Sequence, residues 1–228
     1  MGRSISLDLD VSTQFRDLKF AFFVCETPET YTTPEEQADA QLDIVQAVKT
    51  YFQTREKLAE HPYSVAYSQF YRAMGLKPKT VSTPVQQTLR VFDTNKYKSY
   101  YKIIDIAMKI EYMTLVSFQV YDLEKIQGDM VYRFASSQDT ITTFSGEEKL
   151  CKNKELVLSD DISILHSVYY GNNKYKSIDS NTKINLVRMM CVPGFPSNEF
   201  EHAKHLFSNA IPYLKAVSLD VDSASVTI

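Results

Sequence analysis

The chain has 228 residues, of which 44% are hydrophobic and 23% charged, with a formal net charge of -3. This length suits one compact domain, or one domain with a helical extension, that buries a core without disulfide or metal support. No apolar run approaches the ~20 residues of a membrane helix, and residues 1–9 lack the apolar stretch of a signal peptide. Cys25, Cys151 and Cys191 are odd in number and widely spaced, which favours buried free thiols. We therefore expect a cytoplasmic protein with no membrane partner.

Positive charge is concentrated in two segments of an otherwise acidic chain. Residues 72–109 carry eight Lys and Arg against two acidic residues, and residues 149–188 carry seven against four. These segments are either solvated loops or a local surface that contacts phosphates. The negative total argues against a protein that grips nucleic acid by bulk electrostatics, and no DNA partner is expected.

The N-terminal part combines one strand with helices. Residues 18–24 form an apolar run that predicts a buried strand. Residues 33–36, Thr-Pro-Glu-Glu, supply an N-cap, a first-turn proline and a capping-box glutamate. The helix that they start is predicted to continue through Leu58, and His61-Pro62 ends it.

Two further helices precede a strand-rich region. One is predicted over about residues 64–74 and stops at Gly75, which suits a left-handed position, and the next opens at Thr83-Pro84. Asp105 is expected to lie in an apolar-Asp-apolar strand at residues 104–106. Turn residues then separate β-rich runs, which occupy residues 130–135, 140–144, 155–159, 162–169 and 185–192.

The end of the chain completes an α+β pattern. Ser197 is expected to cap a final helix, which Pro212 breaks. Helices first, sheet in the middle and helix last predict a helical N-terminal part packed on a central, mostly antiparallel sheet. We expect a single domain over residues 1–228. Its parts are an N-terminal strand and helical extension (1–66), a core (67–192), and a C-terminal helix with a tail (193–228).

General catalytic motifs are absent from the sequence. There is no phosphate-binding loop, no Gly-x-Gly-x-x-Gly and no Gly-x-Ser-x-Gly. His202 and His205 are three residues apart but have no third ligand nearby, so we predict neither a metal site nor a cofactor.

Four ordered motifs between residues 67 and 190 resemble a known family. The first is Tyr-Arg-Ala-Met-Gly-Leu-Lys-Pro at 71–78, followed by Ser82 and Leu89-Arg90, and the second is Ile-Asp-Ile at 104–106, which leads to Tyr-Asp-Leu-Glu-Lys-Ile-Gln-Gly at 121–128. The third is the run 131–135, followed by Thr-Phe-Ser-Gly at 143–146. The fourth is Glu-Leu-Val-Leu-Ser-Asp at 155–160, which leads through Gly171 to Thr182-Lys183. Their order and spacing resemble the tRNA-binding and editing domain of the phenylalanyl-tRNA synthetase beta subunit, and more closely its freestanding relatives.

The resemblance implies a fold, a partner and a class of reaction. It implies an α+β domain with a pocket between sheets. In the synthetase that pocket hydrolyses tyrosine wrongly attached to the tRNA for phenylalanine, and the freestanding relatives act similarly in trans. The implied partner is the aminoacylated acceptor end of a tRNA, and aminoacylation activity is not expected.

The residues at the implied site depart from the synthetase pattern. Ala107 and Met108 stand where the synthetase continues with Thr and Asn, and Gln119 stands where it has His. Residues 171–174, Gly-Asn-Asn-Lys, replace its Gly-Gly-Glu loop. The resemblance therefore implies deacylation as a class without the synthetase's substrate. The candidates for the pocket are Ala107, Met108, Gln119, Gly171, Asn172, Asn173 and Thr182, and those for tRNA contact are Arg72, Lys77, Lys79, Arg90, Lys98, Lys174 and Lys183.

Three functions remain open at this point. The chain is a trans-acting aminoacyl-tRNA deacylase, a non-catalytic module that binds tRNA or an aminoacyl group, or a binder of an amino-acid-like small molecule. Asp105 and Asp122 are interpreted as structural residues, one anchoring a turn after a strand and the other capping the following loop. Convergence of the basic residues on the mouth of the pocket favours the tRNA functions over the small-molecule function.

Overall fold

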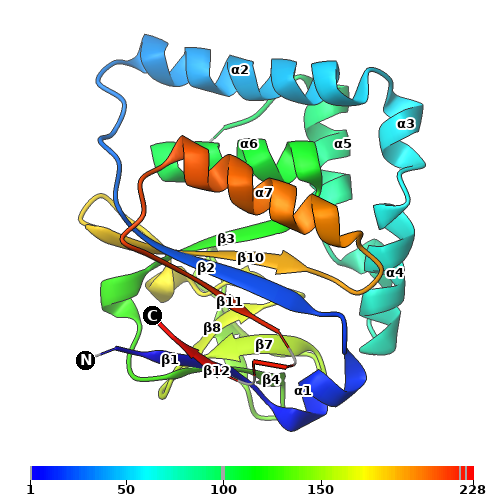
Figure 1. The fold of residues 1–228 in the computed structure, drawn as a ribbon, viewed down its shortest axis with the longest axis vertical. Coiled ribbons are helices and arrows are strands. Elements are labelled where there is room, and N and C mark those ends of the chain that lie inside the picture. Colours follow the sequence, from blue (N-terminus) through cyan, green and yellow to red (C-terminus); the bar gives the residue numbers. More distant parts are fainter. Residues whose placement is uncertain (1, 99–100, 221, 224) are drawn as a thin grey trace.

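The fold contains two main β-sheets packed face to face beneath a layer of helices (Figure 1). The computed structural model describes residues 2–98, 101–220, 222–223 and 225–228. The larger sheet has six strands in the order β12-β1-β4-β7-β8-β9. Its strands are β12 (Ser225–Thr227), β1 (Ser4–Leu7), β4 (Met130–Phe134), β7 (Leu156–Ser159), β8 (Ile164–Ser167) and β9 (Gly171–Asn172). Its pairs are antiparallel except that β1 runs parallel to β4.

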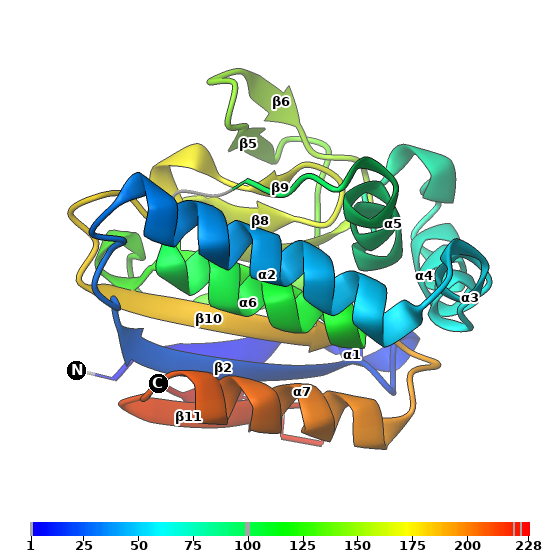
Figure 2. The same cartoon turned by 90° about the horizontal axis from the view of Figure 1, so that it is seen from above.

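The second sheet is fully antiparallel and lies between the six-stranded sheet and the helices (Figure 1). Its order is β11 (Lys215–Leu219), β2 (Lys19–Glu26), β10 (Ile184–Cys191) and β3 (Ser117–Asp122). A short hairpin of β5 (Thr140–Thr142) and β6 (Glu148–Leu150) stands out from this body near β9 (Figure 2). The predicted α+β class with a mostly antiparallel sheet is confirmed.

Helices cover the face of the four-stranded sheet that points away from the larger sheet. α6 and α7 lie on that face, and α2 forms an outer layer over α6 (Figure 2). The described helices are α1 (Leu9–Gln14), α2 (Pro34–Phe52), α3 (Arg55–Ala59), α4 (Tyr63–Ala73), α5 (Pro84–Thr94), α6 (Lys102–Thr114) and α7 (Ser197–Ala210), with single 3₁₀ turns η1 (Pro78–Thr80), η2 (Leu123–Lys125) and η3 (Lys174–Lys176).

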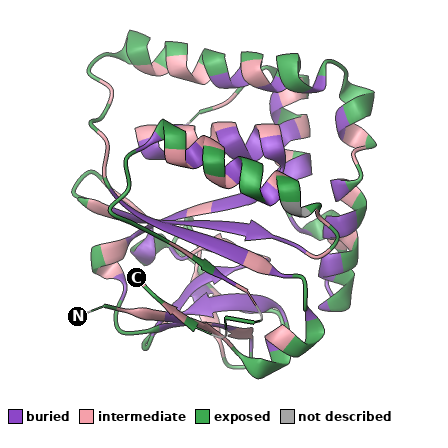
Figure 3. Ribbon diagram, viewed as in Figure 1, coloured by how far each residue is buried: buried purple, intermediate pink, exposed green. Residues whose placement is uncertain are grey.

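Alternation along β10 divides the core in two. Val187 and Met189 face α6 and α7, whereas Leu186 and Met190 face the space between the sheets. Successive side chains of a strand point to opposite faces of the sheet. A strand that is buried on both faces therefore has a nearly continuous apolar sequence. Figure 3 shows this burial on the strands between the layers. Cys25, Cys151 and Cys191 are buried free thiols, as predicted.

Segments outside residues 67–192 contribute to both sheets. β2 lies inside the four-stranded sheet and β11 pairs with it, while β1 and β12 pair with each other at the edge of the larger sheet. The sequence predicted a tail after the last helix rather than two strands. β11 and β12 are short and mostly exposed, so they carry little apolar alternation that a pattern could detect.

The strand predicted at residues 104–106 is wrong, because these residues lie in α6. Three isoleucines around Asp105 favour a strand locally, but Ile103, Ala107 and Ile110 follow helical spacing and pack against the four-stranded sheet. The predicted cap at Ser197 is also wrong, since Pro196 occupies the N-cap position of α7.

The helix predicted to run from residue 34 through Leu58 breaks at Phe52. Gln53 has φ 64° and ψ -49°, and the Thr54 backbone N–H donates to the Phe52 carbonyl at 2.7 Å. This is a γ-turn, a strained conformation for a residue with a Cβ. Thr54 then caps α3 by accepting from the Lys57 N–H.

Replacing Gln53 with glycine is expected to raise the free energy of unfolding by about 1 kcal/mol, because glycine adopts positive φ without a Cβ clash. Asn95→Gly is the matched control. Asn95 also follows a helix at positive φ (55°), but in the left-handed region that asparagine tolerates. Urea unfolding of both variants checks this, and a Gln53→Gly change no more favourable than Asn95→Gly would contradict it.

Candidate functional site

A cavity of about 400 Å³ lies where the two sheets meet α5 and α6. Its lining combines residues of β3, β8 and β9 with residues of these helices and of the segment before α5. It is lined by Tyr71, Ser82, Pro84, Gln87, Ile104, Met108, Glu111, Ser117, Phe118, Gln119, Val120, Phe144, His166, Val168, Tyr169, Tyr170, Gly171, Asn172 and Met190. We call this cavity the inter-sheet pocket. A few polar groups set in an apolar wall are typical of a small-molecule site.

Two amide side chains lie in the inter-sheet pocket. Asn172 donates from Nδ2 to the Val120 carbonyl at 3.2 Å, which ties β9 to β3 across the gap between the sheets. Gln119 lines the same pocket from β3, and its side chain forms no hydrogen bond with another described residue. The Gln119 amide is therefore available to bind a ligand or a water molecule.

A histidine enters the pocket from β8. His166 Nδ1 lies 3.0 Å from Asn172 Oδ1, and its Nε2 lies 3.5 Å from Nη2 of Arg188. The Asn172 oxygen can only accept, so Nδ1 carries the proton and Nε2 faces the guanidinium as an acceptor. Burial, together with the nearby charge of Arg188, lowers the pKa of His166 to about 3. His166 is therefore neutral at physiological pH.

Arg188 is a buried cation at the centre of the molecule. It lies on β10, is 0% exposed, and pairs in register with Gln119 on β3. Its Nε and Nη1 have no hydrogen-bond partner among the described residues. Arginine remains protonated in proteins, so this charge polarises every ionisable group around it.

Glu111 of α6 is the titratable carboxyl of the pocket. It is 2% exposed, and its Oε2 accepts from the Phe118 N–H at 2.7 Å. Burial raises the pKa of Glu111 to about 7, while that hydrogen bond and Arg188 act in the opposite direction. The carboxyl can therefore take up or release a proton near neutral pH.

The raised pKa of Glu111 makes stability depend on pH. The folded state holds this proton more tightly than the unfolded chain, so the stabilisation from the protonated carboxyl is full below the unfolded pKa of about 4.5 and is lost as pH rises to about 7. Relative to the native protein, Glu111→Gln should gain about 3 kcal/mol in free energy of unfolding between pH 4.5 and pH 8. Urea unfolding at both values tests this, and a pH-independent difference would be the contrary result.

The structure brings together four of the seven predicted pocket residues. Met108, Gln119, Gly171 and Asn172 all line the inter-sheet pocket. Ala107 does not, because its side chain is buried in the core cluster that α6 shares with α7 and the four-stranded sheet.

Asn173 and Thr182 instead form hydrogen bonds that hold the neighbouring loops. Asn173 Nδ2 donates to the Ile164 carbonyl at 2.8 Å, and its Oδ1 accepts from the Tyr175 N–H at 3.0 Å. Thr182 donates to Asp122 Oδ2 at 2.7 Å. Asp122 in turn accepts from the Glu124 N–H, so it caps the loop after β3 as predicted.

Asp105 also has a structural partner, although not the one expected. Asp105 lies in α6, and its carboxylate accepts a hydrogen bond from the Tyr31 hydroxyl. It therefore does not anchor a turn after a strand. Tyr31 lies in the connection between β2 and α2, so this bond fixes that connection against α6.

Some of the predicted tRNA-contact residues converge beside the pocket. Arg90 and Lys98 line a second cavity of about 450 Å³ together with Lys96. This cavity shares Ser82 and Gln87 with the inter-sheet pocket, so the two adjoin. Lys174 begins η3, and only Asn173 separates it from the β9 segment that lines the pocket.

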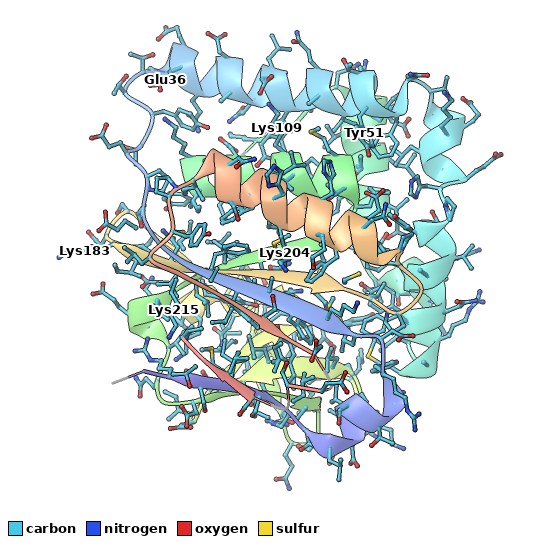
Figure 4. The ribbon with its side chains drawn as sticks, viewed as in Figure 1. Glu36, Tyr51, Lys109, Lys183, Lys204 and Lys215 are labelled. Atoms are coloured by element: carbon cyan, nitrogen blue, oxygen red, sulfur yellow. The ribbon has the colours of Figure 1, made fainter. Side chains whose placement is uncertain are left out.

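The other predicted cations lie elsewhere. Arg72, Lys77 and Lys79 are exposed on α4 and the segment that follows it, and line neither cavity. Lys183 projects at the end of the molecule opposite α5 (Figures 1, 2 and 4). Convergence is therefore partial.

Sequence reasoning missed His166, Glu111 and Arg188. Arg188 could have been noticed as a lone charge in the middle of the predicted apolar strand 185–192. Glu111 carried no such signal, because it lies just beyond residues taken for a strand, where neither its helix nor its burial was expected.

Residues 66–195, more than half of the chain, match the family described as the B3/4 domain. The chain belongs to the B3/4 domain family. Over 81 residues it is 30% identical to the phenylalanine–tRNA ligase beta subunit of Fusobacterium nucleatum, a stretch that covers 36% of this chain and 10% of that protein. The predicted resemblance to the synthetase beta subunit is thereby confirmed.

An N-terminal fragment of the phenylalanyl-tRNA synthetase beta subunit from Pyrococcus horikoshii aligns with a TM-score of 0.43 and 10% identity, over 90% of this chain and 47% of that fragment. The chain thus spans about a tenth of the curated relative and about half of the solved fragment.

Two kinds of feature are absent from the described residues of this B3/4 protein. No helix there combines the length and apolar character that crossing a bilayer requires. Nor do three or more His, Cys, Asp or Glu side chains in that part of the chain gather where they could hold a metal ion.

Proposed function

We propose that this B3/4 protein binds the aminoacyl end of a charged tRNA in the inter-sheet pocket and hydrolyses the ester. The observation that carries the proposal is the set of side chains that line the inter-sheet pocket. Glu111, which titrates near neutral pH, lines it together with the available amide of Gln119. The adjoining cavity holds Arg90, Lys96 and Lys98, which supply positive charge for the phosphates of an RNA partner.

Ester hydrolysis needs few groups, because the aminoacyl ester is already labile. In the proposed step ionised Glu111 accepts a proton from a water molecule, and the water oxygen bonds to the ester carbonyl carbon. The bond from that carbon to the ribose oxygen then breaks, and the ribose oxygen takes the proton that Glu111 had accepted, which leaves Glu111 ionised again. Gln119 is placed to orient the water or the carbonyl by hydrogen bonding.

His166 has a positioning role in this proposal. With a pKa lowered to about 3 it is a weak base, so it does not take the proton from water. Its bond to Asn172 fixes that side chain on β9, and Asn172 in turn holds β9 to β3. The pocket wall thus keeps its shape through a neutral hydrogen-bonded chain.

The test is ester loss from a panel of mischarged tRNAs, compared with the spontaneous rate. We expect acceleration on at least one member, with a rate that rises with pH and levels off above about 7 as Glu111 ionises. Glu111→Gln should lower this rate about 100-fold or more, whereas the exposed Glu56→Gln on α3 should leave it unchanged. Absence of acceleration on every tRNA would refute the proposal, and full activity of Glu111→Gln would refute the role of Glu111.

A further inference from the structure

The β5–β6 hairpin and residues 171–176 line a groove beside the inter-sheet pocket. At its inner end Phe144 of the hairpin lines the pocket together with Gly171 and Asn172. At its outer end Thr140 and Thr142 of the same hairpin line a cavity of about 520 Å³ together with Tyr175. Residues of the same two segments therefore line both cavities, and we call the groove between these segments the hairpin cleft. Figure 2 shows the β5–β6 hairpin beside β9.

Lys174 lies between the two ends of the hairpin cleft. Its Nζ is 3.6 Å from the position that a Cβ on Gly146 would occupy, so the lysine crosses to the turn of the hairpin. Gly146 has φ 86°, and its N–H donates to the Thr143 carbonyl to close that turn. The order along the cleft is therefore aromatic, cation, aromatic.

Both aromatic side chains of the cleft are unusually exposed. Phe144 is 65% exposed and Tyr175 is 67% exposed. A single exposed apolar side chain needs no explanation. Two of them, one on each wall of a cleft that adjoins the inter-sheet pocket, offer flat surfaces on which unstacked bases can lie.

The charges of the cleft leave Lys174 as the cation for a ligand. Lys125 bonds Asp179 at 2.7 Å, and Lys176 bonds Asp160 at 2.8 Å, so both are already neutralised. Lys174 is exposed and forms no ion pair with another described residue. Glu147, next to the turn, is paired with Lys149 at 3.0 Å.

We propose that the hairpin cleft binds the unpaired nucleotides that adjoin the aminoacylated ribose. Phe144 and Tyr175 each stack on a base, and Lys174 binds a phosphate between them. The inference rests on the proposed function, since it gives the path by which the tRNA end reaches the pocket. The ligand is single-stranded, because bases within a duplex have no free faces for the aromatics.

Fluorescence anisotropy with a labelled five-nucleotide RNA ending in CCA tests the aromatics. Phe144→Ala and Tyr175→Ala are each expected to weaken binding by about fivefold or more, the usual loss when one stacking contact is removed. Tyr51→Ala is the matched control, because Tyr51 is 46% exposed but lies on α2 (Figure 4). It should bind like the native protein, and a blunt RNA duplex should bind less tightly than the single strand.

The salt dependence of the same titration tests Lys174. Loss of one phosphate contact should reduce the slope of log affinity against log salt by about 0.7 in Lys174→Ala. Lys215→Ala removes an exposed lysine from β11 (Figure 4) and should leave the slope unchanged. Native protein that does not bind the RNA, or aromatic variants that bind it as tightly as the native protein, would overturn the inference.

A minimal ester separates this inference from the proposed function. Aminoacyl-adenosine has no adjoining nucleotide, so Tyr175→Ala should hydrolyse it at the native rate while losing activity on aminoacyl-tRNA through a raised KM. If the protein hydrolyses both esters but the aromatic variants bind RNA as tightly as the native protein, the cleft proposal is rejected and the deacylase proposal stands. If RNA binding depends on Phe144 and Tyr175 but neither ester is hydrolysed, the deacylase proposal is rejected and the cleft proposal stands.

Discussion

A positive charge buried between two sheets is the constraint on which this structure depends. Arg188 is completely buried on β10, the strand that both sheets and the helices pack around. Removing such a charge from water costs several kcal/mol unless neighbouring groups compensate. The groups that the fold places around this charge are a buried carboxyl from α6, the acceptor nitrogen of His166 at 3.5 Å, and the phenols of Tyr121 and Tyr132.

The chemistry of the pocket follows from that constraint. The guanidinium helps to keep His166 neutral, and it partly offsets the burial that raises the pKa of Glu111. A histidine that cannot charge and a carboxyl that titrates near pH 7 are therefore two effects of one environment. The synthetase pattern has a histidine at the position of Gln119, which is not a base. The ionisable group that lines this pocket and titrates near neutral pH is Glu111 instead.

The sequence predicted the elements better than it predicted the site. Caps and breakers located α2, α4 and α5, and apolar runs located β2, β4, β7 and β10, because these signals are local. Isoleucine favours strands, so the sequence predicts a strand at residues 104–106, yet the helical spacing of the surrounding residues places them in α6. β11 and β12 were missed because exposed edge strands carry little pattern.

The site could not be read in full because it forms only when distant segments meet. Positional resemblance found Gln119 and Asn172, but Glu111, His166 and Arg188 are separated by up to 77 residues and become neighbours through sheet pairing and helix packing. Similarly, Arg90 and Lys98 adjoin the pocket while Lys183 lies at the other end of the molecule. Charge counts along a chain do not distinguish these positions.

The most direct test of this account is two-dimensional NMR of the labelled protein with a non-hydrolysable aminoacyl-adenosine amide. If the inter-sheet pocket is the functional site, the largest shift changes will fall on the side-chain amides of Gln119 and Asn172 and on the ring of His166. A separate cavity of about 570 Å³ lies between α2, α6 and α7 and is lined by residues that include Tyr31 and Lys109. Shift changes confined to that cavity, or none at all, would contradict the account.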